Sequence, residues 1–240
     1  LTPDDALVEY LEDHGLHRVT RRLLSGGALD VVATAAPGIR DILVLGKVKQ
    51  IERSGTADLI VLDAPAAGHA ITFLRSARGL VDAARTGPVH TQATEVLEML
   101  TDPERCQVVL VTLPEETPVN ELVDTAYSLE DEVGVSLGPV VVNGLYPSID
   151  GLDGDPSQLA TAAGLDVAAA DLAAMSAAAA FRAQRSSLQA EQVDRLGAAL
   201  PLPQLTLPSL FSSDLGPVEL EVLADALSRG IAELDALPSQ

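Results

Sequence analysis

Three short apolar runs, each ended by a polar or turn-forming residue, constrain the fold of this chain most strongly. They cover residues 57–63 (ADLIVLD), 107–113 (QVVLVTL) and 139–143 (PVVVN). Continuous, partly β-branched runs of this length are typical of strands buried on both faces, as in a parallel sheet. Helical segments separate the runs, and this alternation predicts parallel pairing through right-handed crossovers. The expected fold is therefore α/β, with a doubly wound, mostly parallel sheet flanked by helices.

Glycine and proline mark the other predicted elements. A break at 86–88 divides the helical stretch 70–100, and Gly134 is expected to stop the helix that opens at Thr117 and Pro118. Lys47 and Lys49 are expected to be solvated near the end of their helix. The remaining expectations are helices at 3–14, 19–24 and 39–48, two helices within 157–199, a short strand at 202–207, and a final helix after Gly216-Pro217.

Composition narrows the class of protein. Hydrophobic residues make up 47% of the chain but aromatic residues only 2%, so the core must be built from Leu, Val, Ile and Ala. The net charge of −20 argues against a nucleic-acid partner, which needs a basic face, and against an anionic membrane surface. No apolar run is long enough to span a bilayer, and no basic-then-apolar leader is present. Cys106 is the only cysteine, which fits a cytoplasmic setting without disulfides.

The chain contains no long linker and no internal repeat, so residues 1–240 are predicted to form a single domain with an Ala-rich helical segment at about 157–199. In a doubly wound sheet the carboxyl ends of the strands converge on one edge, where ligands bind. The polar residues at these ends are Asp63, the 112–116 loop, Asn143 and the 207–211 loop. Taken singly, Asp63 is also compatible with a helix cap and Asn143 with a turn.

The phrase D-A-P-A-A-G-H at 63–69 resembles the D-T-A-P-T-G-H signature of ArsA-like ATPases, the arsenite-pump and tail-anchored-protein-targeting family. Two further segments add to the resemblance: V-V-N at 141–143 and L-P-S-L-F at 207–211. The match covers most of the chain, up to about residue 145, and is most similar to an actinobacterial-type subgroup. It implies a P-loop ATPase of the SIMIBI fold type.

The resemblance also implies roles for individual residues. Asp63 would hold Mg²⁺ through water, and Gly68 and His69 would move with the γ-phosphate as parts of switch II. Asn143 and Pro208 would contact the adenine ring. The implied cofactors and partners are ATP, Mg²⁺ and a second subunit, in a homodimer or in a heterodimer with a paralogue.

One departure from the family is large. A nucleotide hydrolase of this class needs a glycine-rich loop of the form G-x-x-x-x-G-K-[ST], which cradles the phosphates. The nearest match, at Gly46-Lys47, has Asp41 in place of the first glycine and Val48 in place of the hydroxyl residue. In the family this loop lies near the N-terminus, so it is expected upstream of Leu1, together with the N-terminal strands and the catalytic residues.

Two other interpretations stay open from the sequence. The chain is also compatible with a non-catalytic, degenerate member of the family that acts as a subunit or scaffold beside an active paralogue. It is compatible, too, with an unrelated α/β small-molecule binder in which Asp63 and Asn143 are turn residues. Ala64 and Ala67 replace the two threonines of the family signature, so hydroxyl contacts made there by the family would be lost.

Overall fold

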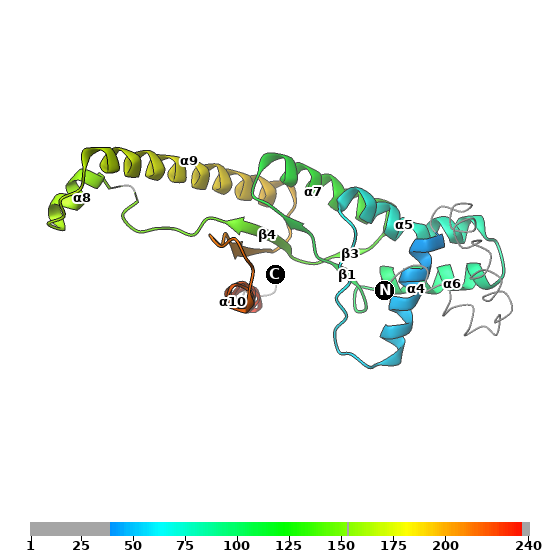
Figure 1. The fold of residues 1–240 in the computed structure, drawn as a ribbon. Coiled ribbons are helices and arrows are strands. Elements are labelled where there is room, and N and C mark those ends of the chain that lie inside the picture. The colour runs from blue at the N-terminus through cyan, green and yellow to red at the C-terminus, as the bar shows by residue number, and fades with distance from the viewer. Residues whose placement is uncertain (1–38, 153, 237–240) are drawn as a thin grey trace, which may run out of the picture. The chain divides into compact units, whose positions relative to one another are not determined.

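The computed structural model describes residues 39–152 and 154–236, and the predicted helices at 3–14 and 19–24 lie outside them. The described chain is α/β, with helices and two small parallel sheets (Figure 1). It divides into two compact units. Among the described residues, the first unit comprises 39–108 and 125–137, and the second comprises 109–124, 138–152 and 154–236.

The first unit is built on three helices that pack together: α4 (Ile39–Ser54), α5 (Ala67–Ala83) and α6 (Pro88–Thr101). Gly87 has φ 99, a backbone conformation that side chains other than glycine rarely adopt, so the predicted break between α5 and α6 is confirmed. The apolar side chains buried in these helices are Leu45, Phe73, Leu74, Ala77, Ala93, Val96, Met99 and Leu100.

Lys49 was predicted to be solvated, and this is wrong. Lys49 is only 4% exposed, and its Nζ donates to Gln92 Oε1 and to Glu95 Oε2, both at 2.6 Å. The reason is helix packing: α4 lies against α6, so the aliphatic stem of Lys49 is covered and its ammonium group meets two acceptors on α6. An ammonium group buried in this way must be paired.

The strand predicted at 57–63 does not form in the described chain. The segment has no regular secondary structure, and Leu59 and Val61 are 79% and 82% exposed. A strand exists only when a neighbour accepts and donates its backbone hydrogen bonds, and no described strand pairs with this segment. Its apolar side chains stay exposed because no described neighbouring strand positions the segment in a sheet.

The run at 107–113 forms two short strands instead of one. Strand β1 (Gln107–Val108) pairs in parallel with β3 (Ser136–Leu137) in the first unit. Strand β2 (Val111–Thr112) pairs in parallel with β4 (Val140–Leu145) in the second unit. The predicted burial on both faces is also wrong here, because Val111 lies on an edge strand and is exposed.

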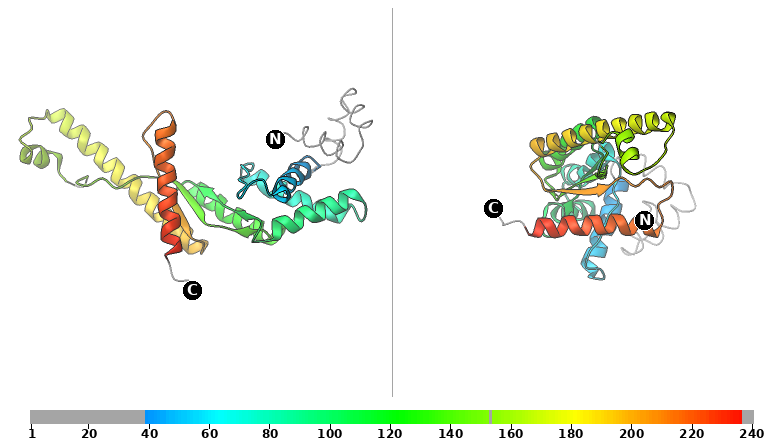
Figure 2. Two further views of the ribbon diagram at one scale, coloured as in Figure 1. Left: turned by 90° about the horizontal axis from the view of Figure 1, so that it is seen from below. Right: turned by 90° about the vertical axis from the view of Figure 1, so that its left-hand side faces the viewer.

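The second unit contains a three-stranded parallel sheet in the order β2-β4-β5, with β5 at Gln204–Pro208. Parallel pairing is thereby confirmed. The buried residues of this sheet are Thr112, Val140, Val141, Val142 and Leu205. Helix α9 (Ala169–Ala199) and helix α10 (Pro217–Asp235) lie on opposite faces of the sheet (Figures 1 and 2). Gly230 lets α10 approach closely, since a Cβ there would lie 2.9 Å from Leu205 Cδ2.

The connections between strands follow the expected pattern. Helix α7 (Glu116–Ser128) leads from β2 and continues as a π-helical turn, η1 (Leu129–Val133), which ends at Gly134 with φ 79 as predicted. Helix α8 (Pro156–Ala162) precedes α9, so the two predicted Ala-rich helices are confirmed. Across residues 39–152 and 154–236, every helix is too short or too polar to cross a membrane.

Candidate functional site

Asp63 lies in an exposed segment without regular structure, four residues before α5 begins at Ala67. Its exposed carboxylate is free to meet a hydrated cation. In the described part of the chain, no three His, Cys, Asp or Glu side chains gather as a metal site. A magnesium ion held by Asp63 through water would take its direct ligands from phosphate oxygens and water, as Mg²⁺ commonly does.

Gly68 and His69 lie in the first turn of α5. The N-cap residue is Ala66, which has no side-chain acceptor for the first helical N–H groups, although its carbonyl accepts from His69 N at 2.8 Å. The uncapped start of a helix carries a partial positive charge and open N–H donors, which favour an anion. Both residues are exposed, so a phosphate group can reach this turn.

Asn143 lies at an irregularity of strand β4. Val142 pairs with Thr206 and Leu145 pairs with Pro208, so β4 uses one more residue than β5 between these two pairs. Gly144 supplies the required backbone conformation with φ 76. Bulges of this kind redirect a side chain and are common beside functional sites. The Asn143 amide is half-buried and makes no hydrogen bond to another residue that the structure describes.

Pro208 ends β5 directly beside this bulge. Ser209 N donates to Leu145 O at 2.8 Å, which holds the loop after β5 against the end of β4. The structure thus brings Asn143 and Pro208 to the carboxyl ends of neighbouring strands. Both polar atoms of the Asn143 amide, one donor group and one acceptor, match the edge of an adenine ring.

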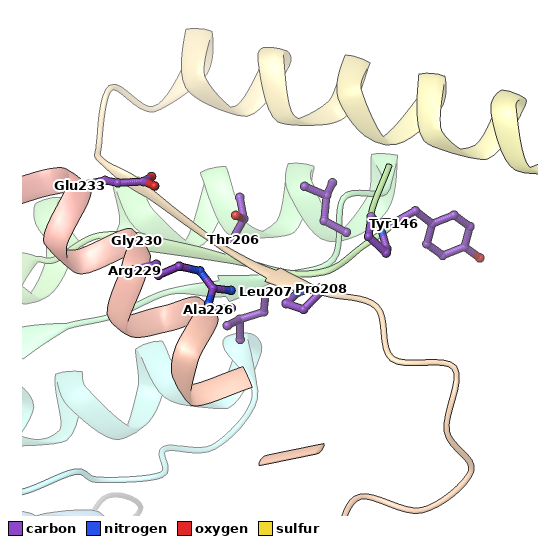
Figure 3. Close-up of a pocket in the computed structure, with 10 residues that line it drawn as sticks. Tyr146, Thr206, Leu207, Pro208, Ala226, Arg229, Gly230 and Glu233 are labelled. Atoms are coloured by element: carbon purple, nitrogen blue, oxygen red, sulfur yellow. The ribbon is translucent and has the colours of Figure 1, made fainter. Parts of the chain in front are cut away.

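A pocket of 280 Å³ adjoins these strand ends (Figure 3). Pro208 and Thr206 line it from β5, while Arg229 and Glu233 line it from α10. Its volume is close to the lower end of the range for small-molecule sites, about 300–1,000 Å³. Asn143 is not among the lining residues, so the pocket touches the predicted site through Pro208 only.

Sequence reasoning missed a group of side chains on α9 at the same strand ends. Arg182 lies over the rings of Tyr146 and Phe211, with its Cζ 4.5 Å and 4.9 Å from the two ring centroids. Arg185 donates to Glu115 at 2.9 Å. The available signal was the appearance of two arginines at helical spacing directly after a long stretch without basic residues.

The predicted site residues fall into two groups. Asp63, Gly68 and His69 share one segment of the first unit, whereas Asn143 and Pro208 share one edge of the sheet in the second unit. Each group is consistent with chemistry on a nucleotide: the first with a metal-bound phosphate and the second with a base.

Comparison with known proteins gives matches over nearly the whole chain. The chain is 31% identical over 248 residues to "ATPase BagA" of Mycobacterium tuberculosis strain H37Rv and to "Putative ATPase Mb3704" of Mycobacterium bovis. Each alignment covers 93% of this chain and 70% of the relative. A "Putative arsenical pump-driving ATPase" of Halobacterium salinarum is 31% identical over 121 residues, which is 47% of this chain and 19% of that protein. No family model matches the chain.

The α/β fold and these relatives place the chain in a class of proteins that are named ATPases. Within that class, the chain belongs to the family of ArsA-like ATPases. The recognition made from 63–69, 141–143 and 207–211 is thereby confirmed at the level of the family.

Proposed function

We propose that the chain is the carboxyl-terminal part of an ArsA-like ATPase that binds and hydrolyses ATP to drive a conformational change of switch II, residues 63–69. The observation that carries this proposal is the D-A-P-A-A-G-H phrase at the start of α5 in a chain related to ATPases over 93% of its length. A carboxylate, a short loop and a helix start follow one another there, and this order suits a segment that senses a metal-bound phosphate.

Asp63, Gly68 and His69 are the residues we assign to the phosphate end. Bound MgATP would supply the chemistry, because its reaction with water to ADP and phosphate releases free energy. The Asp63 carboxylate would hold the magnesium ion by accepting hydrogen bonds from its bound water. Gly68 and His69, exposed in the first turn of α5, follow the γ-phosphate and shift when it leaves. This shift changes a surface recognised by a second subunit or a client.

Asn143 and Pro208 are the residues we assign to the base. The amide of Asn143, redirected by the bulge at Gly144, reads the donor and acceptor edge of adenine. Pro208 packs against the ring from the neighbouring strand. The pocket beside Pro208 supports the Pro208 part of this assignment, because it leaves a space of 280 Å³ at the end of β5.

For the complete ATPase we propose one doubly wound, mostly parallel sheet of the SIMIBI type, in a single cytoplasmic domain that dimerises. Two features support the larger sheet. Among the residues that the structure describes, the apolar segment 57–63 has no strand partner, and β2 is an edge strand with Val111 exposed. Both have backbone groups and apolar side chains that further strands would pair and bury.

The phosphate-holding loop is the part that these 240 residues do not contain. The test therefore uses the longest form of the protein that its gene encodes, titrated with a fluorescent ATP analogue in the presence and absence of Mg²⁺. We expect saturable binding that requires Mg²⁺. Binding that is absent, or that does not depend on Mg²⁺, contradicts the proposal.

The missing glycine-rich loop favours a second candidate, a non-catalytic family member that serves as a subunit or scaffold beside an active paralogue. The coding sequence in front of Leu1 discriminates the two. An open frame with a glycine-rich phosphate loop supports the ATPase. A start codon directly at this position supports the scaffold, and then the chain is expected to co-purify with a paralogue that carries the loop.

A further inference from the structure

One face of α9 carries three side chains that reach the loops after all three strands of the sheet in the second unit. These are Arg182, Arg185 and Gln189, spaced at i, i+3 and i+7 as neighbours on a helix face. The loops follow β2, β4 and β5 at their carboxyl ends, the edge to which Asn143 and Pro208 belong.

Arg182 joins the loop after β4 to the loop after β5. Its Nη2 donates to Pro147 O at 2.8 Å, and its guanidinium covers both Tyr146 and Phe211. The two rings lie 5.7 Å apart at an interplanar angle of 54°. The Arg182 Nε atom is buried without a hydrogen-bond partner, so stacking on the two rings is a main part of what holds this side chain. Phe211 as a whole remains 74% exposed.

Arg185 attaches the same helix to the loop after β2, and Gln189 attaches it a second time to the end of β4. Arg185 Nη2 pairs with Glu115 Oε1 at 2.9 Å, in the loop between β2 and α7. Gln189 is 4% exposed, and its amide donates to Gly144 O at 3.1 Å and accepts from Tyr146 N at 2.8 Å. Gln189 thereby satisfies two backbone groups that the bulge of β4 withdraws from the sheet.

The part of α9 that precedes Arg182 behaves differently. Residues 169–181 contain no buried side chain, and Met175 and Phe181 are exposed. Together with α8, which packs on α9, this part forms a projecting arm (Figures 1 and 2). Helix α9 is therefore one continuous element of 31 residues, anchored at the strand ends over one half and free over the other.

We propose that Arg182 and Arg185 are positioning residues that tie the projecting arm of residues 156–181 to the three strand-end loops, so that a change in these loops moves the arm. The contacts that attach the arm to the loops are present in the chain without ligand. The proposal rests on the proposed function only in naming a nucleotide as the ligand that changes the loops.

The test is hydrogen exchange of the 240-residue chain, measured by mass spectrometry without ligand. The variants are Glu115→Arg, Arg185→Glu and the double exchange of both charges. Each single variant is expected to raise the exchange rate in the arm at 169–181 about twofold to fivefold, which corresponds to the free energy of an exposed ion pair. This effect is expected for the Glu115 variant too, although Glu115 is far from the arm in sequence. The double variant is expected to restore the wild-type rates. Glu191→Arg, an exposed charge reversal on α9 itself, is the control and is expected to leave the arm unchanged.

Wild-type exchange of the arm in Glu115→Arg, with faster exchange confined to the 113–116 loop, overturns the proposal. So does a double variant that remains as fast as the single variants. A second measurement adds MgATP to the longest encoded form. The proposal is supported if nucleotide binding changes hydrogen exchange in the arm of the wild type, if this change is absent in Arg185→Glu, and if it returns in the double variant. Nucleotide binding without any change in the arm overturns it and leaves the ATPase assignment intact. An absence of binding contradicts the ATPase assignment, and the ligand-free series then decides the proposal.

Discussion

At the scale of single residues, the proposed recognition of the adenine base depends on the side chain of Asn143. Replacing it with Ala removes a donor and an acceptor from a half-buried position, so we expect ATP binding to weaken by about 1–3 kcal/mol. The measurement is the dissociation constant for a fluorescent ATP analogue in the longest encoded form. The matched control is Asn120→Ala, an exposed asparagine on α7. Equal affinities of the two variants would refute the role of Asn143.

Glu95 is expected to make the stability of the first unit depend on pH in the acid range. The hydrogen bond from Lys49 is the main cause that lowers the pKa of Glu95 below its ordinary value of 4.5, with a further contribution from Arg53. A carboxyl group with a lowered pKa in the folded state stabilises the fold above its unfolded pKa. This stability is lost as the pH falls below 4.5 and through the lower folded value.

Glu95→Gln is therefore expected to lower the free energy of unfolding at neutral pH by about 1–3 kcal/mol, because the buried Lys49 loses its charged partner. The difference from wild type should shrink in acid below pH 4.5. Denaturant unfolding across this pH range measures it. Glu98→Gln, at an exposed position on the same helix, should keep the wild-type pH dependence. A constant difference at all pH values would show that Glu95 contributes by packing alone.

At the scale of elements, two glycines separate the roles of space and backbone conformation. A Cβ on Gly79, inside α5, and a Cβ on Gly87, before α6, would both meet nothing within 4 Å, but only Gly87 has a positive φ. Gly79→Ala is expected to stabilise the chain by about 0.5–1 kcal/mol through helix propensity. Gly87→Ala is expected to destabilise it by about 1–3 kcal/mol. Thermal unfolding of the two variants measures the contrast, and equal shifts in Tm would contradict it.

The elements that the sequence predicted well are those whose signals are local. Helix limits at Gly134 and Gly216-Pro217 depend on backbone preferences of a few neighbouring residues, and the structure has them where expected. The strand at 57–63 depends on a hydrogen-bonding neighbour that an apolar run cannot reveal, and it does not form in the described chain. The prediction that Lys49 is solvated was wrong for a related reason, since its burial follows from how α4 packs against α6.

The candidate site shows the same division. Asn143 and Pro208 could be found from their motifs, and their adjacency follows from the parallel order of the strands. The contacts of Arg182, Arg185 and Gln189 could not be predicted, because their partners are separated from them by 35, 70 and 45 residues in sequence. Long-range contacts of this kind become visible only once the path of α9 over the sheet is known.

At the scale of the whole molecule, charge is the dominant property. With 35 acidic and 15 basic residues, the chain repels itself in the compact state. Raising the ionic strength from about 0.01 M to about 0.15 M shortens the Debye length from about 30 Å to about 8 Å and screens this repulsion. We therefore expect the Tm to rise over this range of sodium chloride. A Tm that falls would mean that favourable ion pairs such as Glu52–Arg105 outweigh the net repulsion.

The central claim is that 63–69 is a nucleotide-responsive switch, and Asp63 tests it most directly. The measurement compares Asp63→Asn with Asp58→Asn, a second exposed aspartate of the same irregular segment, for Mg²⁺-dependent binding of a fluorescent ATP analogue to the longest encoded form. A residue that acts on a metal through water predicts a loss of about 10–100-fold in the affinity that depends on Mg²⁺ for Asp63→Asn, and wild-type affinity for Asp58→Asn. Indistinguishable affinities of the two variants and the wild type would contradict the account.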